Sequence, residues 1–119
     1  MLNKLLGSLV QQDTAPVVIC DTKSVVRYMN PAAVKRYHAD LTGRDVRECH
    51  PPEANEKIER VLRWFEASKD NNRVYTYRNE RENKDVYMIA LRDEKGELIG
   101  YYEKHEYRSR ETAALYDMG

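Results

Sequence analysis

The middle of the sequence carries the segment Gly43-Arg44-Asp45-Val46-Arg47-Glu48-Cys49-His50-Pro51-Pro52, which separates several short apolar runs from the longest amphipathic pattern. Gly43 predicts a turn at the start of the segment. The two prolines prevent a helix from running through its end, and Pro52 suits the first turn of a new helix, where a missing N–H costs no hydrogen bond. The segment therefore predicts a bend into a long helix, and its Cys49 and His50 make it a candidate site for chemistry.

The long helix is predicted by apolar spacing on the C-terminal side of this segment. Ile58, Val61, Leu62 and Phe65 follow one another at i, i+3, i+4 and i+7, which places them on one face of an amphipathic helix. We expect this helix to cover residues 53–68.

Shorter elements are predicted on the N-terminal side. Two β-branched runs, 16–20 and 25–29, flank a polar turn and indicate a hairpin. Asn30-Pro31 then predicts the start of a short helix over 32–37, because asparagine caps helix N-termini and proline suits the first helical position.

Three further strands are predicted after the long helix, over residues 73–78, 86–91 and 98–107. The turns between them are short, so the strands should be antiparallel, and Gly96 stands where a hairpin turn needs a positive φ. This order predicts an α+β fold in which a five-stranded antiparallel sheet carries helices on one face.

The first residues predict a separate amphipathic helix over residues 1–13, with an apolar stripe formed by Leu2, Leu5, Leu6 and Leu9. Two interpretations of the stripe stay open. It packs on its own domain, where it covers part of the other face of the sheet, or it packs on a second copy and forms a homodimer. Residues 14–108 form the domain, and 109–119 are predicted to be a frayed tail or a short helix.

Composition narrows the function classes. The 119 residues are enough for one domain, and twenty basic residues balance twenty acidic ones, so neither nucleic acid nor an anionic membrane is an expected partner. No apolar run reaches the roughly 18 residues that span a bilayer, and we expect a cytoplasmic protein. Cys20 and Cys49 are too few for a disulfide framework and are expected to be reduced thiols.

Several motifs in this order resemble the PAS domain over about residues 14–108. They are Asp21, Asn30-Pro31-Ala32-Ala33, Leu41-Thr42-Gly43-Arg44, Asp93-Glu94-Lys95-Gly96 and Gly100. The resemblance implies the PAS fold and a sensory or interaction module of the bacterial signalling type, not an enzyme. Its Cys49-His50-Pro51-Pro52 looks most like the PAS modules of bacterial proteins with hemerythrin-like domains.

The sequence also departs from common PAS patterns. Tyr107-Arg108-Ser109 stands where many members have Asp-Ile-Thr before a signalling helix, so the usual coupling to a downstream output domain is not expected. Asp45-Val46-Arg47-Glu48-Cys49 stands in place of the Asn-Cys-Arg-Phe-Leu motif of the light-sensing flavin type, so we do not expect that photochemistry.

A ligand pocket is expected between the sheet and the helix 53–68, and its candidate lining residues are Tyr37, Cys49, His50, Phe65, Tyr87 and Met88. Haem is the leading possible cofactor, with His50 or Cys49 as the axial ligand, because haem iron accepts either side chain. Adjacent residues rarely point the same way, so we expect at most one of the two to face the pocket. The alternative is that both are ordinary structural residues.

Three functions therefore remain open: a sensor of a small ligand, a haem sensor, and a ligand-free protein-interaction module. In the first, ligand binding would shift the strand 98–107 and the N-terminal helix and so change the geometry of a dimer. His38 and His105 have polar neighbours and are interpreted as surface residues. The sequence shows no paired short spacing of zinc ligands and no catalytic motif.

Overall fold

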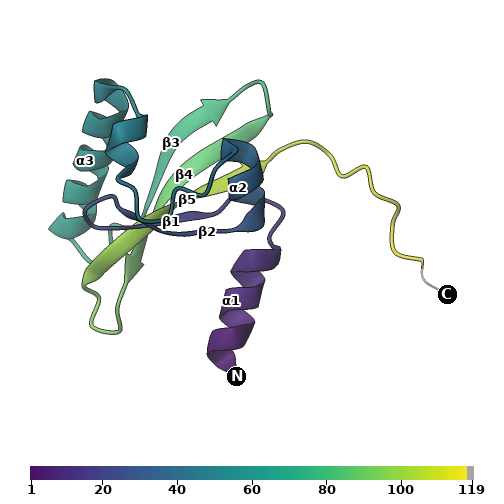
Figure 1. The fold of residues 1–119 in the computed structure, drawn as a ribbon, viewed down its shortest axis with the longest axis horizontal. Coiled ribbons are helices and arrows are strands. Elements are labelled where there is room, and N and C mark those ends of the chain that lie inside the picture. The colour runs from purple at the N-terminus through teal and green to yellow at the C-terminus, as the bar shows by residue number, and fades with distance from the viewer. Residues whose placement is uncertain (118–119) are drawn as a thin grey trace.

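The computed structural model describes residues 1–117, and it contains the predicted order of elements (Figure 1). The elements are α1 (Leu2–Gln12), β1 (Val18–Asp21), β2 (Val26–Met29), α2 (Pro31–Tyr37), the 3-10 turn η1 (Val46–Cys49), α3 (Pro52–Ala67), β3 (Arg73–Asn79), β4 (Lys84–Arg92) and β5 (Leu98–Tyr107). Only η1 has no counterpart among the predicted elements. Residues 108–117 contain neither helix nor strand, and the last two residues of the predicted tail lie outside the described part.

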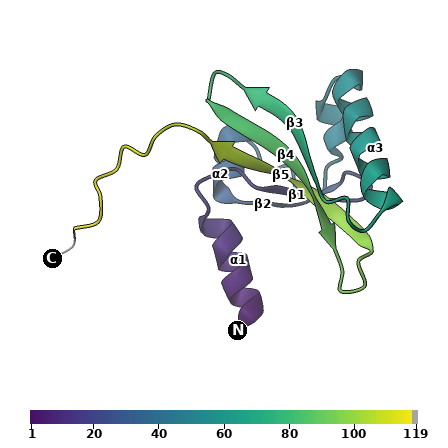
Figure 2. The ribbon, with the colours of Figure 1, turned by 180° about the vertical axis from the view of Figure 1, so that it is seen from behind.

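All five strands form one antiparallel sheet in the order β2-β1-β5-β4-β3, which confirms the predicted fold class. The last strand therefore lies at the centre and joins the N-terminal hairpin to the C-terminal one (Figure 2). Gly100 permits this pairing, because a Cβ atom at this position would lie 2.3 Å from the carbonyl oxygen of Cys20 on β1.

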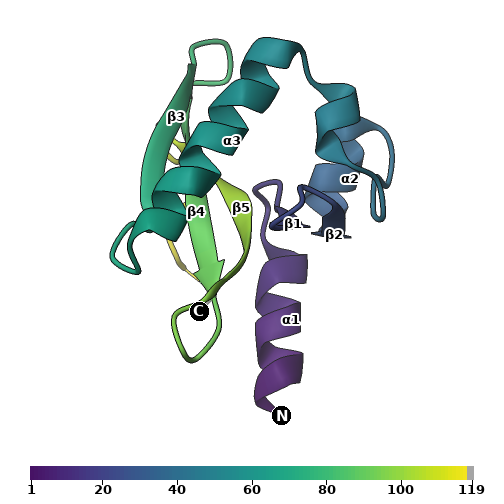
Figure 3. The ribbon, with the colours of Figure 1, turned by 90° about the vertical axis from the view of Figure 1, so that its left-hand side faces the viewer.

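One face of the sheet, which we call the inner face, is covered by α2, η1 and α3 (Figure 3). The predicted stripe of α3 is buried there, and Phe65 is fully inaccessible to solvent. Met88 of β4 and Tyr101 of β5 meet it from the sheet. Burying each large apolar side chain contributes roughly 1.5–3 kcal/mol, so this layer is the main source of stability.

The segment Gly43–Pro52 pairs with the N-terminal hairpin before it turns into α3. The N–H of Gly43 donates to the carbonyl of Val26 at 2.7 Å, and the N–H of Val46 donates to the carbonyl of Ser24 at 2.9 Å. Gly43 has a φ of +88°, which explains the glycine at the predicted turn. The segment is thus held against the sheet, and this fixes where α3 begins.

Asn30 joins α1 to the domain. Its fully buried side chain caps α2 by accepting from the N–H of Ala33, and its amide nitrogen donates to the carbonyls of Val10, Asp13 and Ala15. Beyond this anchor α1 projects away from the sheet, and none of its residues is buried (Figures 1 and 3). The interpretation in which the stripe covers the other face of its own sheet is therefore wrong.

Within residues 1–117, no helix is both long enough and apolar enough to cross a membrane.

Arg92 at the end of β4 holds the carboxyl end of α3. One of its guanidinium nitrogens, Nη2, donates to the carbonyls of Phe65, Ser68 and Asn71 at 2.7–3.0 Å, and Nη1 donates to the carbonyl of Gly96. The last turn of α3 contains no basic residue of its own. Arg92 therefore supplies the positive charge and the donors that a helix C-terminus needs.

The substitution Arg92→Met should lower the free energy of unfolding by about 2–3 kcal/mol, because several partly buried carbonyls lose their donor. Chemical denaturation of the purified variant measures this loss. Arg63→Met, an exposed position on α3, is the control and should change stability by less than about 0.5 kcal/mol. Equal stabilities for the two variants would contradict the proposed role of Arg92.

Candidate functional site

Two adjoining cavities lie between the helices and the inner face of the sheet. One has a volume of about 260 Å³, and the other about 190 Å³. Tyr37, His50, Ile58 and Glu103 line both, so the cavities share a common wall. They differ in chemistry, and we call the larger one the polar chamber and the smaller one the apolar chamber.

The polar chamber is lined by cationic side chains from three elements. Arg36 comes from α2, Lys57 from α3 and Lys84 from β4, and Glu103 and His105 of β5 stand beside them. Lys57 donates to the carbonyl of Thr76 at 2.7 Å. The alternation of β4 and β5 brings Lys84, Glu103 and His105 to the inner face, together with the apolar residues of the core.

Lys84 is buried to 1 % exposure, which is rare for a lysine. Its Nζ lies 3.5 Å from Oε2 of Glu82 and makes no hydrogen bond with any described residue. The centroid of the Tyr107 ring lies 5.2 Å from the same nitrogen. Burial lowers the pKa of Lys84, and the neighbouring charge of Arg36 acts in the same direction.

His105 lies in the same chamber, so its predicted surface position is wrong. It pairs across the sheet with Val86, and its Nδ1 is buried without a hydrogen-bond partner within residues 1–117. Burial, followed by the charges of Lys84 and Arg36, lowers the pKa of His105 to about 4. The imidazole is therefore neutral at physiological pH.

Glu103 faces both chambers from the middle of β5. Burial raises the pKa of this carboxyl, while the charges of His50, Lys84 and Lys57 partly oppose the rise. The carboxyl is thus easier to protonate than an exposed glutamate, and in that form it can donate a hydrogen bond into the cavity.

Apolar side chains surround the second chamber: Val18, Cys20, Leu41, Val46 and Tyr101. The hydroxyl of Tyr101 is paired, because it donates to Oγ of Ser24 at 2.9 Å. Burial raises the pKa of the Cys20 thiol to about 11, so this cysteine remains a neutral thiol.

Four of the six predicted pocket residues line these chambers. Tyr37 and His50 border both, Met88 lines the polar chamber, and Cys49 lines the apolar one. The expectation that at most one of the adjacent Cys49 and His50 faces the pocket is wrong, because both border the apolar chamber, at its exposed rim. The extended backbone of His50 that follows η1 allows this arrangement.

The other two predicted residues lie elsewhere. Phe65 is part of the solid core and lines neither chamber. Tyr87 points to the opposite face of the sheet, which we call the outer face. There its ring centroid lies 5.2 Å from that of Tyr75 and 3.9 Å from the guanidinium carbon of Arg73. The prediction of Tyr87 as a pocket residue is wrong because adjacent strand residues face opposite sides, and Met88 already faces inward.

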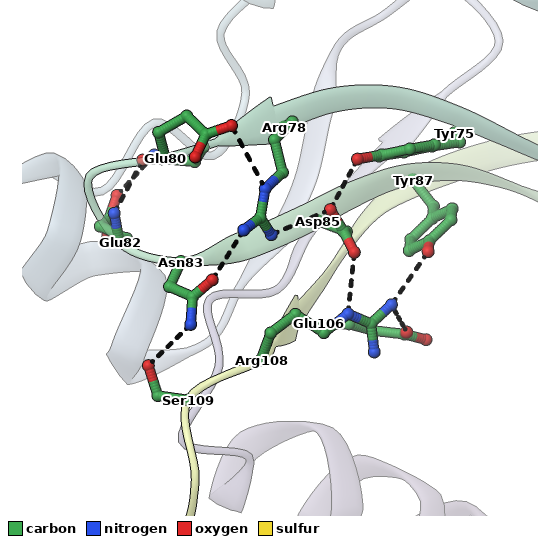
Figure 4. Close-up of polar contacts among 11 residues, drawn as sticks. Tyr75, Arg78, Glu80, Glu82, Asn83, Asp85, Tyr87, Glu106, Arg108 and Ser109 are labelled. Atoms are coloured by element: carbon green, nitrogen blue, oxygen red, sulfur yellow. Dashed lines mark hydrogen bonds and ion pairs between the residues drawn. The ribbon is translucent and has the colours of Figure 1, made fainter.

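On the outer face a polar network surrounds Asp85 (Figure 4). The Tyr75 hydroxyl donates to Oδ1 of Asp85 at 2.6 Å, and Nε of Arg108 donates to Oδ2 at 2.8 Å. These two donors lower the pKa of Asp85 to about 2. Arg108, the first residue after β5, also donates to the Tyr87 hydroxyl and to Glu106. We call Tyr75, Asp85, Tyr87, Glu106 and Arg108 the outer-face network.

The part of the chain that the structure describes has no group of three or more His, Cys, Asp or Glu side chains placed to hold a metal ion.

A family model described as a PAS domain matches residues 14–103. Among solved structures, the PAS domain of BvgS from Bordetella pertussis is 18% identical, with a TM-score of 0.66 and coverage of 92% of this chain and 88% of that chain. A sensory box sensor histidine kinase from Vibrio cholerae is 15% identical, with a TM-score of 0.59 and coverage of 88% and 87%. The C-terminal domain of a Streptococcus mutans protein is 21% identical, with a TM-score of 0.66 and coverage of 88% and 84%.

No curated protein matches the chain significantly. The family match nevertheless covers most of the sequence, and it coincides with the sheet and with the helices that enclose the two chambers. The chain therefore belongs to the PAS domain family.

Proposed function

We propose that this chain is a PAS-type sensory module that binds a small ligand in the two chambers and relays its presence through a dimer. The observation that carries the proposal is a two-chamber cavity whose shared wall includes Glu103 of the central strand β5. The likeness to a sensory box of a histidine kinase supports a signalling role. No step in this function requires the chain itself to be an enzyme.

The strand β5 offers a physical route from the cavity to the outer face. Glu103 and His105 line the polar chamber, and the alternate residue Glu106 belongs to the outer-face network. The same strand pairs with β1, which leads back to α1. A ligand that displaces β5 would therefore act on Arg108 and on the base of α1 together.

The dimer is supported by the exposed stripe of α1. Leu2, Leu5, Leu6 and Leu9 are 52–70% exposed in the single chain. An isolated helix of this length is marginally stable in water, so it needs a covering surface. A row on the outer face, formed by Tyr28, Ile19, Tyr102 and Ile89 in register across four strands, is half-buried. We assign the covering surface to a second copy, which presents the same apolar residues in return.

The double substitution Leu5→Glu/Leu9→Glu should convert the dimer to a monomer, because it places two charges in the apolar interface. Light scattering coupled to size-exclusion chromatography measures the mass. Asn3→Glu/Lys4→Gln changes the net charge by the same amount on other faces of α1, and this control should remain dimeric. If the leucine variant and the control have the same mass, the stripe does not form the dimer interface.

The haem alternative is less well supported by the geometry. Each chamber is smaller than the roughly 300–1,000 Å³ of typical drug-sized pockets, and a haem macrocycle needs a larger slot. His50 and Cys49 lie at the exposed rim, where an axial ligand would hold the iron outside the enclosed volume. The Cys49-His50-Pro51-Pro52 segment still supports our proposal that the chain belongs to the hemerythrin-associated PAS subgroup, without requiring haem.

Haemin added to the purified protein should give the same Soret spectrum with the wild-type chain, with His50→Ala and with Cys49→Ala, since neither residue can hold iron inside the chambers.

A small ligand should instead move the methyl NMR signal of Met88, which lines the polar chamber, and leave that of Met1, which is 89% exposed, unchanged. A Soret band lost in either variant would establish the haem sensor. If no member of a metabolite library moves Met88, the ligand-free interaction module would replace our proposal.

A further inference from the structure

We propose that the ligand is a small organic acid whose carboxylate binds in the polar chamber and whose apolar part fills the apolar chamber. This inference rests on the proposed function and names the chemical class of its ligand. It follows from the cationic side chains Arg36, Lys57 and Lys84, which line the polar chamber and do not line the apolar one.

The first step of the argument is the incomplete pairing of Lys84. An ammonium group has three donors, and burying one without partners is costly. Its ion-pair partner Glu82 already accepts from Arg36 at 2.8 Å and from the amide of Asn79 at 2.8 Å. The oxygens of Glu82 are thus engaged, and the Lys84 ammonium, which lines the chamber, has donors free for a bound anion.

The neighbours of Lys84 complete a site for one negative charge. Arg36 and Lys57 add positive charge to the same chamber, and the unpaired Nδ1 of His105 offers a further polar contact. Glu103 limits the charge that the chamber accepts, because an ionised glutamate would repel a multiply charged anion. A single carboxylate, which takes hydrogen bonds from Lys and Arg, fits this balance better than phosphate does.

The shape of the cavity defines the rest of the ligand. The apolar chamber adjoins the polar one along the wall of Tyr37, Ile58 and Glu103. Its volume of about 190 Å³ suits a short alkyl chain or a single aromatic ring. A ligand with a carboxylate at one end and an apolar group at the other would therefore contact both chambers at once.

Isothermal titration calorimetry of the full chain with phenylacetate and its neutral isostere phenylacetamide tests the charge requirement. The wild-type protein should bind the acid about 10- to 100-fold more tightly than the amide. Lys84→Met keeps a long, unbranched side chain and removes a buried charge, so this variant should fold, and it should bind the acid and the amide equally. Lys104→Met, an exposed position on the outer side of β5, should retain the wild-type preference.

A chain-length series of acetate, butyrate and hexanoate tests the second half of the inference, because affinity should rise while the alkyl chain fills the apolar chamber. Equal binding of acid and amide by the wild-type protein would overturn the carboxylate site and leave the proposed sensor intact. Inorganic phosphate that binds as tightly as the best acid would show a simple anion site and overturn the role of the apolar chamber. If none of these acids binds, the inference fails. The proposed sensor is then tested separately, by whether uncharged ligands move the methyl NMR signal of Met88.

Discussion

A single buried amide, that of Asn30, connects α1, β1 and α2. Its oxygen accepts from the N–H groups of Val17 and Ala33, and its nitrogen donates to three carbonyls in and just after α1. One side chain therefore sets the start of β1, the start of α2 and the exit of α1. Each hydrogen bond contributes only about 0.5–1.5 kcal/mol, but the carboxamide combines donors and an acceptor in one plane, so a single side chain makes all of these contacts. The direction in which α1 leaves the domain depends on it.

Two cations on β4, the buried Lys84 and the half-buried Arg92, differ in how completely their donors are paired. Each donor nitrogen of Arg92 has an acceptor, at the end of α3, in the turn that follows α3, or at Gly96 in the hairpin between β4 and β5. Lys84, at the other end of the strand, has one ion pair and no hydrogen bond within the described chain. A fully paired cation stabilises a fold, whereas one with free donors favours an added partner. The contrast between the two is the reason for assigning a binding role to Lys84.

Local patterns predicted the helices and the strands, because those depend on residue spacing and on capping and turn residues along the chain. The family was predicted from a resemblance carried by short motifs such as Asn30-Pro31-Ala32-Ala33. The 53–68 stripe and the Asn30-Pro31 cap are examples in which local pattern and tertiary packing agree. The cavity was harder to predict. Residues 86–91 are almost continuously apolar, so the pattern does not say which of Tyr87 and Met88 faces inward. Lys84 and His105 have polar neighbours in sequence, and only the cross-strand register shows that they share the inner face. Counting back in twos from Met88 would have been the one signal for Lys84.

The two cysteines differ in a way that has a practical consequence. Cys20 is 3% exposed and its raised pKa keeps it protonated, whereas Cys49 is exposed beside the apolar chamber. Thiol-reactive reagents attack thiolates that they can reach, so the native chain presents a single modifiable thiol. That thiol stands at the entrance to the cavity and in the turn that leads into α3. A fluorophore coupled there would sense events in the cavity from its rim, so the unmodified sequence already provides the attachment point for an optical reporter.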